Sequence, residues 1–140
     1  MTALQNLVAM ASRPQESPTD APRRPLAVWV RVCKVADLER ERGLAALIDG
    51  EQVALFRTHD DRIHAVQQLD PYSGAYVMSR GIVGTKGDAP TVASPMYKQV
   101  FDLRTGACLE TQGKDAYSLR VWPVAVDSSG DVFIKWKAPA

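Results

Sequence analysis

The chain has 140 residues, of which 46% are hydrophobic and 24% charged, a composition typical of one globular domain with its own core. Its 17 basic and 16 acidic residues nearly cancel, and no run of Lys or Arg forms a phosphate-binding stripe, which argues against a nucleic-acid-binding protein. No apolar run approaches the roughly 18 residues of a membrane span and no export signal is recognisable, so we expect a cytoplasmic protein.

Residues 1–25 differ in composition from the rest of the chain. Residues 12–25 read SRPQESPTDAPRRP, with four prolines among polar and charged residues. Such a segment buries too little apolar surface to offset the entropy lost on ordering. We therefore predict a mobile N-terminal arm over residues 1–25, dispensable for folding, and one domain over residues 26–140.

The first half of the domain begins with a period-two alternation over residues 27–35, in which valines at positions 28, 30 and 32 alternate with other residues, and this indicates a strand. Residues 36–42 interrupt this pattern with ADLERER and indicate a polar helical turn. Further on, Asp49-Gly50 lies between two apolar runs, and Asp-Gly in that position is typical of a tight β-hairpin. The strands predicted in this half cover residues 27–35, 44–48, 52–57 and 62–67.

The second half begins with a stretch rich in glycine, residues 70–88, which we predict to be irregular. The strands predicted after it cover residues 91–93, 99–102, 107–110, 118–126 and 131–136. With about nine short strands and almost no helix, the sequence predicts an all-β fold, a small antiparallel β sandwich or barrel.

Two segments resemble the two cluster-binding loops of Rieske domains. They are LDPYSGA at residues 69–75 and ASPMYKQVFDLRTG at residues 93–106. In that family the first loop carries Cys-x-His followed by Gly, and the second carries Cys-Pro-x-His followed by a Phe-Asp hairpin. The matching scaffold residues are Pro71, Gly74, Pro95, Phe101, Asp102 and Gly106. The resemblance implies a Rieske-like fold with both loops at one tip.

The four ligand positions of the family carry other residues here, namely Asp70, Tyr72, Ser94 and Tyr97. A Rieske cluster needs two thiolates on one iron and two imidazoles on the other. Serine hydroxyls are not ionised near neutrality and phenols ionise only near pH ~10, so we expect no [2Fe-2S] cluster and no metal in this chain. We expect Tyr72 and Tyr97 to pack together in the place of the cluster, with a hydroxyl bonded to Ser94 or Asp70.

The chain does contain two Cys and two His, the number of ligands that a Rieske cluster takes. None of them forms a Cys-x-His or Cys-x-x-His pair, because Cys33, His59, His64 and Cys108 are spread over strands and a turn. We therefore interpret both cysteines as buried free thiols, which suits a reducing cytosol.

The loops with replaced ligands resemble one branch in particular, the small subunit of assimilatory NAD(P)H-dependent nitrite reductase. The likeness runs from about residue 31 to residue 136. It implies a large catalytic subunit as partner, carrying FAD, an iron–sulfur cluster and sirohaem, which reduces nitrite to ammonium. This chain is then a non-catalytic subunit of an oxidoreductase in nitrate assimilation, without activity or cofactor of its own.

Basic and aromatic side chains near the loops are candidates for the partner-binding surface, because such residues suit interfaces. The predicted contacts are Tyr76, Met78, Arg80 and Lys98. We expect Arg62 and Lys114 to lie away from the tip. The tryptophans Trp29, Trp122 and Trp136 are interpreted as core or rim packing.

Two other functions remain open at this point. The first is a Rieske-type ferredoxin-like electron-transfer protein with an atypical [2Fe-2S] cluster, which iron content and colour would reveal. The second is a general protein-interaction domain, which a pull-down from nitrate-grown cells would distinguish from a reductase subunit.

Overall fold

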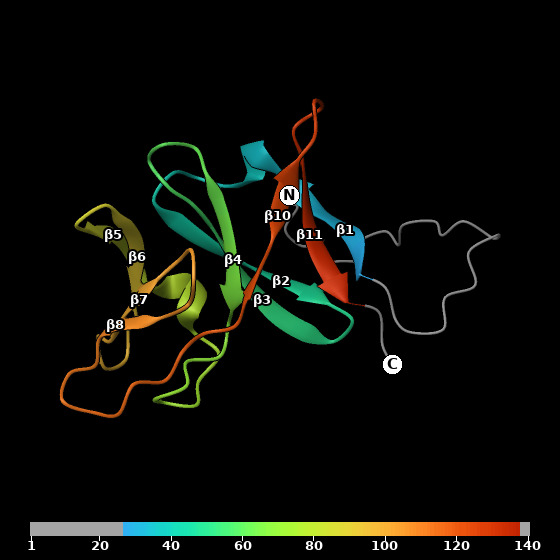
Figure 1. Ribbon diagram of the computed structural model, residues 1–140. Coiled ribbons are helices and arrows are strands. Elements are labelled where there is room, and N and C mark those ends of the chain that lie inside the picture. Colours follow the sequence, from blue (N-terminus) through green and yellow to red (C-terminus); the bar gives the residue numbers. More distant parts are fainter. Residues whose placement is uncertain (1–26, 138–140) are drawn as a thin grey trace.

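The computed structural model describes residues 27–137, which form eleven β-strands and two short 3-10 helices (Figure 1). The fold is therefore all-β, as predicted. The predicted N-terminal arm, residues 1–25, lies outside the described residues. Over residues 27–137, no helix is long and apolar enough to cross a membrane.

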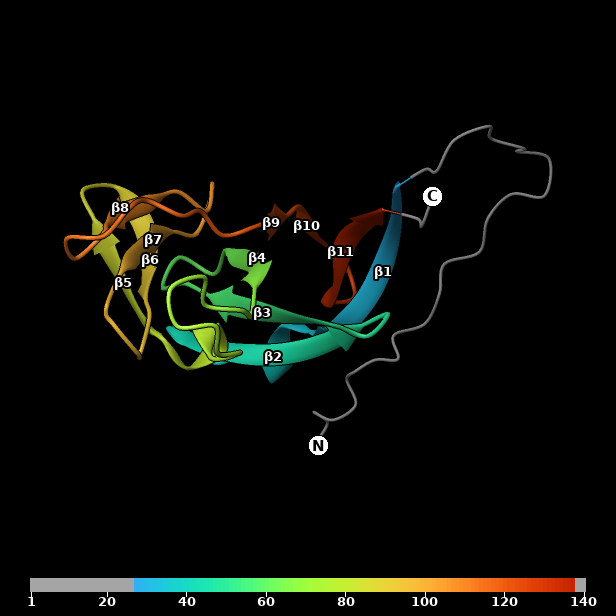
Figure 2. The ribbon, with the colours of Figure 1, turned by 90° about the horizontal axis from the view of Figure 1, so that it is seen from below.

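The strands form three antiparallel sheets. The first joins β1 (Ala27–Lys34), β11 (Asp131–Lys137) and β10 (Val124–Val126). The second joins β2 (Arg42–Ile48), β3 (Glu51–Arg57), β4 (Ile63–Gln67) and β9 (Val121–Trp122). The third joins β5 (Ile82–Lys86), β6 (Ala89–Ala93), β7 (Val100–Asp102) and β8 (Cys108–Glu110). Figures 1 and 2 show this third sheet at one end of the molecule, away from β1 and β11.

The first and second sheets enclose one core, to which β1, β2, β3, β4 and β11 contribute. A β-bulge between Arg31 and Cys33 interrupts the alternation of β1, so that the neighbours Val32 and Cys33 are both buried. Burial raises the pKa of the Cys33 thiol to about 12. This cysteine is the inert core residue that the sequence predicts, whereas Cys108 is half-buried.

A second core lies between the other face of β3 and the third sheet. Strand β3 is buried on both faces, with Val53 and Leu55 in the first core and Ala54 and Phe56 in the second. Met78 belongs to this second core, together with residues of β6 and β7. The second core fixes the third sheet, and with it the loops of the tip, against the body of the domain.

The hairpin predicted at Asp49-Gly50 is confirmed, and both residues have the positive φ values that a tight turn of this kind requires, 50° and 79°. Two local predictions are wrong. Residues 70–88 contain the strand β5 and the 3-10 helix η2 (Met78–Arg80). The 3-10 helix η1 spans Val35–Asp37, so only the first two residues of the helical turn predicted over residues 36–42 are helical. Strand β5 has no alternation of apolar and polar residues that would mark it in the sequence, because neither of its faces is fully buried. Its hydrogen-bonded pairing with β6 maintains it.

Candidate functional site

A buried carboxylate joins the two loops of the tip. Asp70 of the first loop and Ser94 of the second are both fully buried, and the Ser94 hydroxyl donates a hydrogen bond to Asp70 Oδ2 at 2.6 Å. The Ser73 hydroxyl donates to the same oxygen at 2.9 Å, and the backbone amide of Tyr72 donates to Asp70 Oδ1 at 2.9 Å. The carboxylate thus receives three hydrogen bonds and holds two positions together that are 24 residues apart in the sequence.

The two loops have the same backbone design. In the first, Gly74 N–H donates to Asp70 C=O at 2.8 Å, and in the second, Lys98 N–H donates to Ser94 C=O at 3.1 Å. Gly74 and Lys98 both have positive φ, 77° and 69°. Lys98 therefore occupies a left-handed position at which the first loop uses glycine, at a cost on the order of 1 kcal/mol.

Tyr72 does not pack against Tyr97, so that prediction is wrong. The Tyr72 hydroxyl donates to the backbone C=O of Asp115 at 2.5 Å and accepts from the Tyr117 N–H at 2.9 Å. Its ring lies 5.1 Å from the ring of Tyr117, whereas Tyr97 is 56% exposed. The hydroxyl bonds neither Ser94 nor Asp70; its partners are Asp115 and Tyr117, with Cys108 Sγ 3.5 Å away.

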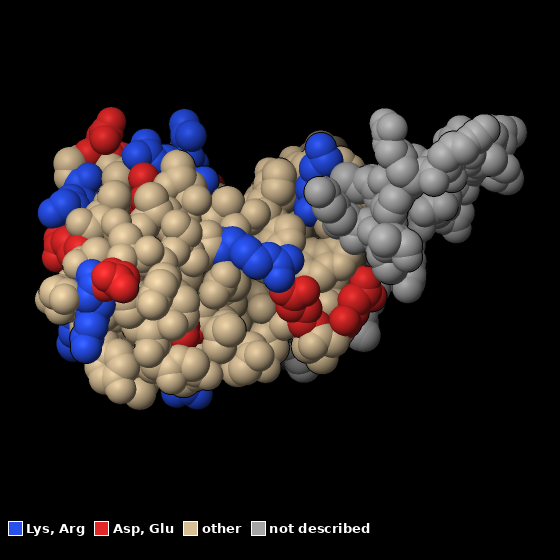
Figure 3. Space-filling model, turned by 60° about the horizontal axis from the view of Figure 1, so that its bottom comes forward, with Lys and Arg blue, Asp and Glu red and all other residues tan. Residues whose placement is uncertain are grey.

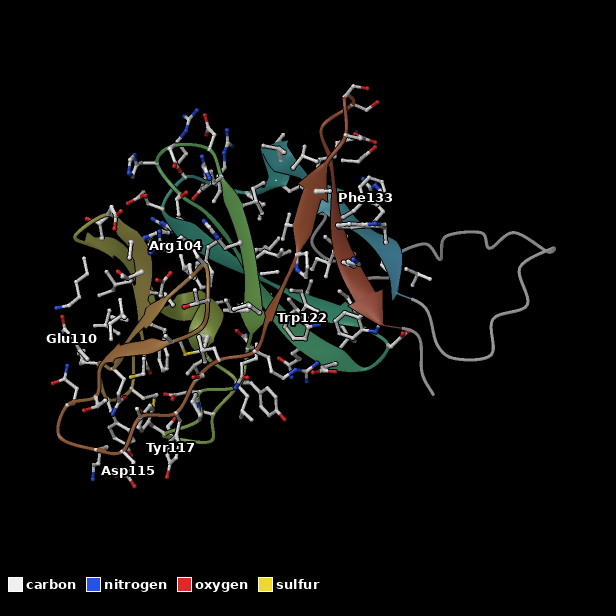
Figure 4. The ribbon with its side chains drawn as sticks, in the orientation of Figure 1. Arg104, Glu110, Asp115, Tyr117, Trp122 and Phe133 are labelled. Atoms are coloured by element: carbon white, nitrogen blue, oxygen red, sulfur yellow. The ribbon has the colours of Figure 1, made fainter. Side chains whose placement is uncertain are left out.

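Residues 111–118 therefore form part of the tip, beside the first two loops. Gln112 Nε2 donates to the C=O of Lys98 at 3.0 Å, and Gln99 Nε2 donates to the C=O of Thr111 at 3.4 Å. Figure 4 shows Asp115 and Tyr117 on this segment, at the lower edge of the molecule. We define the tip as residues 70–80, 94–99 and 111–118. Sequence reasoning missed the third segment, since TQGKDAYS has neither a motif nor an apolar period.

The Tyr72 clamp leads to a stability prediction. We expect Tyr72→Phe to lower the free energy of unfolding by about 0.5–1.5 kcal/mol, because the ring packing remains while the hydrogen bonds to the C=O of Asp115 and the N–H of Tyr117 are lost. Urea unfolding measures the change. The matched control is Tyr76→Phe, with a 55% exposed side chain, for which we expect less than about 0.5 kcal/mol. Equal losses in the two variants would contradict a clamp.

The predicted partner contacts fall into two groups. Tyr76, Arg80 and Lys98 have exposed side chains. Met78 does not project from the tip; it is fully buried in the second core, so its prediction as a contact is wrong. Lys114 is also misplaced by the prediction, since it lies on the third segment of the tip. Exposed tip residues that the prediction omitted are Met96, Tyr97 and Tyr117.

The side chains at the four ligand positions do not fit a [2Fe-2S] cluster. A carboxylate and a hydroxyl bonded to each other replace the thiolates, and one clamped and one exposed phenol replace the imidazoles. Over residues 27–137, no three His, Cys, Asp or Glu side chains gather as metal ligands would.

Comparisons with known proteins relate this chain to Rieske-like domains and to nitrite reductase subunits. Residues 28–135 match the family model described as "Rieske-like [2Fe-2S] domain". The "Nitrite reductase (NADH) small subunit" of Salmonella typhimurium is 40% identical over 88 residues, covering 62% of this chain and 82% of that protein. The "Nitrite reductase [NAD(P)H] large subunit" of Klebsiella oxytoca is 36% identical over 128 residues, covering 89% of this chain but only 13% of the larger protein.

A solved structure gives the same result. A Mycobacterium tuberculosis protein assigned as an NADH-dependent nitrite reductase small subunit superposes with a TM-score of 0.72 at 42% identity. The superposition covers 82% of this chain and 98% of that one.

Proposed function

The chain belongs to the Rieske-like [2Fe-2S] domain family, and we propose that it is the non-catalytic small subunit of an NAD(P)H-dependent nitrite reductase. The hydrogen bond between Ser94 and Asp70 carries the proposal. It keeps the two family loops together although the side chains at the ligand positions do not suit a cluster. Loops that keep their arrangement without a cluster fit a role in binding a partner. The proposed function therefore requires no electron transfer through an iron–sulfur cluster in this chain.

The proposed partner is the large catalytic subunit. In the Klebsiella oxytoca large subunit, a segment similar to this chain is part of the same polypeptide. A domain that is fused to the large subunit in one protein supports direct contact between the two as separate chains in another. We propose that the partner carries FAD, an iron–sulfur cluster and sirohaem, and that the complex reduces nitrite to ammonium in the cytoplasm.

The tip has the side chains that suit a docking surface. Tyr76, Met96, Tyr97 and Tyr117 are exposed large apolar residues, and Arg80 and Lys98 lie among them on the loops. Aromatic, methionine and arginine side chains are enriched where proteins associate. The cations favour a partner surface with acidic groups around an apolar centre.

Charge reversal at the tip tests the proposal. We expect Arg80→Glu and Lys98→Glu each to weaken binding of the large subunit by about tenfold or more, because each places a negative charge against an acidic partner surface. Arg62→Glu is the matched control, expected to change the affinity by less than about twofold, since Arg62 lies in the turn between β3 and β4 and is highly exposed. Lys114 cannot serve as a control because it belongs to the tip.

The affinity for the purified large subunit is the measurement, with nitrite-dependent oxidation of NADH by the complex as a second readout. Equal losses in all three variants would indicate only long-range charge steering. No binding by the unaltered chain would contradict the proposed function and leave the general interaction domain in its place.

A further inference from the structure

A furrow runs along the domain beside the tip. Two surface hollows of about 510 and 570 Å³ adjoin, and both are lined by Glu51 and Arg120. The first hollow extends to Leu69 and Tyr76, and the second to Trp122 and Trp136. We call this feature the Arg120 furrow. It has aromatic side chains in both hollows and Arg120 where they adjoin, and Asp49 and Lys135 line the first and the second hollow, respectively.

Arg120 is the central side chain of the furrow. Its guanidinium lies 4.6 Å from the centre of the Trp122 ring and forms an ion pair with Glu51. The Trp122 ring stacks on Trp136 at 5.2 Å, with 19° between the planes. The side chains of Arg120 and Glu51 are 59% and 39% exposed, so water and a partner can reach the ion pair. Figure 3 shows basic and acidic side chains adjoining to the right of the centre of the view, apart from the charged side chains at its left side, and Figure 4 marks the position of Trp122.

We propose that the Arg120 furrow binds an extended segment of the large subunit that carries a carboxylate between apolar residues. The carboxylate replaces Glu51 on Arg120, while the flanking apolar residues contact Tyr76 on one side and Trp122 on the other. This inference rests on the proposed function and adds to it a second contact region and the chemistry of the partner segment.

Continuity with the tip supports this occupant. Tyr76 belongs both to the tip and to the first hollow, so one partner surface can cover the two without a gap. A stable interface buries on the order of 800 Å² on each partner, more than a few loops supply, and the furrow adds area to that of the tip. Tyrosine, tryptophan and arginine are also the residues that most often dominate binding energy.

The second hollow is lined by two cations, Arg120 and Lys135, and by one carboxylate, Glu51, and this excess of positive charge favours an acidic segment there. A guanidinium binds a carboxylate through two parallel hydrogen bonds and remains charged at any relevant pH. Exposed ion pairs contribute only about 0–1 kcal/mol, so exchanging Glu51 for a partner carboxylate costs little. In the free chain, Glu51 holds the Arg120 side chain in place over Trp122 and competes with the partner for it.

The competition gives a test in which two substitutions in one ion pair have opposite effects. We expect Glu51→Gln to tighten binding of the purified large subunit by about two- to fivefold, since the competitor is removed. Arg120→Ala should weaken binding by about tenfold or more, and Arg120→Lys should recover part of that loss because it retains the charge without the bidentate geometry.

The Arg40–Asp61 ion pair is the matched control. Its side chains are 57% and 49% exposed, similar to the Arg120–Glu51 pair, and Asp61 lies in the turn between β3 and β4. Arg40→Ala and Asp61→Asn should leave the affinity unchanged within about twofold. Melting temperatures of all variants verify that each one folds.

The outcomes separate this inference from the proposed function. If the tip variants weaken binding while the furrow variants behave like the Arg40–Asp61 controls, the furrow inference is wrong and the proposed function stands. Weaker binding by Glu51→Gln would also overturn it, because Glu51 would then contact the partner rather than compete with it. If the unaltered chain does not bind the large subunit, the proposed function itself fails.

Discussion

Replacing Asp70 by Ala should reduce the free energy of unfolding by about 3–4 kcal/mol, the largest stability effect that we expect from one substitution at the tip. The carboxylate accepts hydrogen bonds from the Ser94 hydroxyl, the Ser73 hydroxyl and the Tyr72 N–H. Asp70 and Ser94 are fully buried, so water cannot replace the lost acceptor without opening the loops. Urea unfolding followed by circular dichroism measures the loss.

Two further variants separate the lost hydrogen bonds from a general disturbance of the loop. Asp70→Asn keeps an acceptor for the Tyr72 N–H and should cost less than Asp70→Ala. The double variant Asp70→Ala with Ser94→Ala should cost less than the sum of the two single variants, because removing both partners leaves fewer unsatisfied groups than removing one. Asp88→Ala, at an exposed aspartate, is the control and should change stability by less than about 0.5 kcal/mol. Additive losses would contradict a direct contribution from the Ser94–Asp70 bond.

Most strands were predictable because they have a local cause. Alternation marks β1 and β11, and Asp49-Gly50 fixes the turn between β2 and β3. The positions of the two loops could also be predicted from the sequence. Pro71 and Gly74 in the first loop, and Pro95 and Phe101 in the second, have the spacing found in Rieske domains. These features depend on neighbours in sequence and can therefore be derived without the structure.

The role of Tyr72 could not be predicted, because its partners lie 43 and 45 residues further along the chain. No local pattern connects a tyrosine in the first loop with Asp115 and Tyr117. Met78 was misjudged for a related reason. Its position in a glycine-rich stretch indicates a surface loop, but η2 directs the side chain into a core formed by strands far from it in sequence.

The Arg120 furrow was equally hidden from sequence reasoning. Glu51 and Arg120 are 69 residues apart and meet only because β9 pairs with β4, which in turn pairs with β3. Arg120 by itself is one of many basic residues in a chain whose charges nearly cancel. Its significance comes from the ion pair with Glu51 and the contact with Trp122, which the pairing of the strands determines.

Restoring the four family ligands should convert this domain into an iron–sulfur protein. We expect the variant Asp70→Cys, Tyr72→His, Ser94→Cys and Tyr97→His to take up iron and sulfide on anaerobic reconstitution, up to about two irons per chain, and to show visible absorbance, while the unaltered chain binds neither. The first and third positions already face each other, with 2.6 Å between Ser94 Oγ and Asp70 Oδ2, so two cysteines there would lie on the same side of the site.

The expected reconstitution is partial, because the histidines have more to change than the cysteines. Tyr72→His gives up the hydrogen bonds to Asp115 and Tyr117, and the side chain at Tyr97 has to turn inward from an exposed position. The double variant with only Asp70→Cys and Ser94→Cys is the control; kept reduced, it should not form a Rieske-type centre, which requires two imidazoles. A folded fourfold variant without the spectrum would mean that the four positions do not converge as the family ligands do. Stoichiometric iron and sulfide in the unaltered chain would instead contradict the absence of a cluster and favour the electron-transfer function.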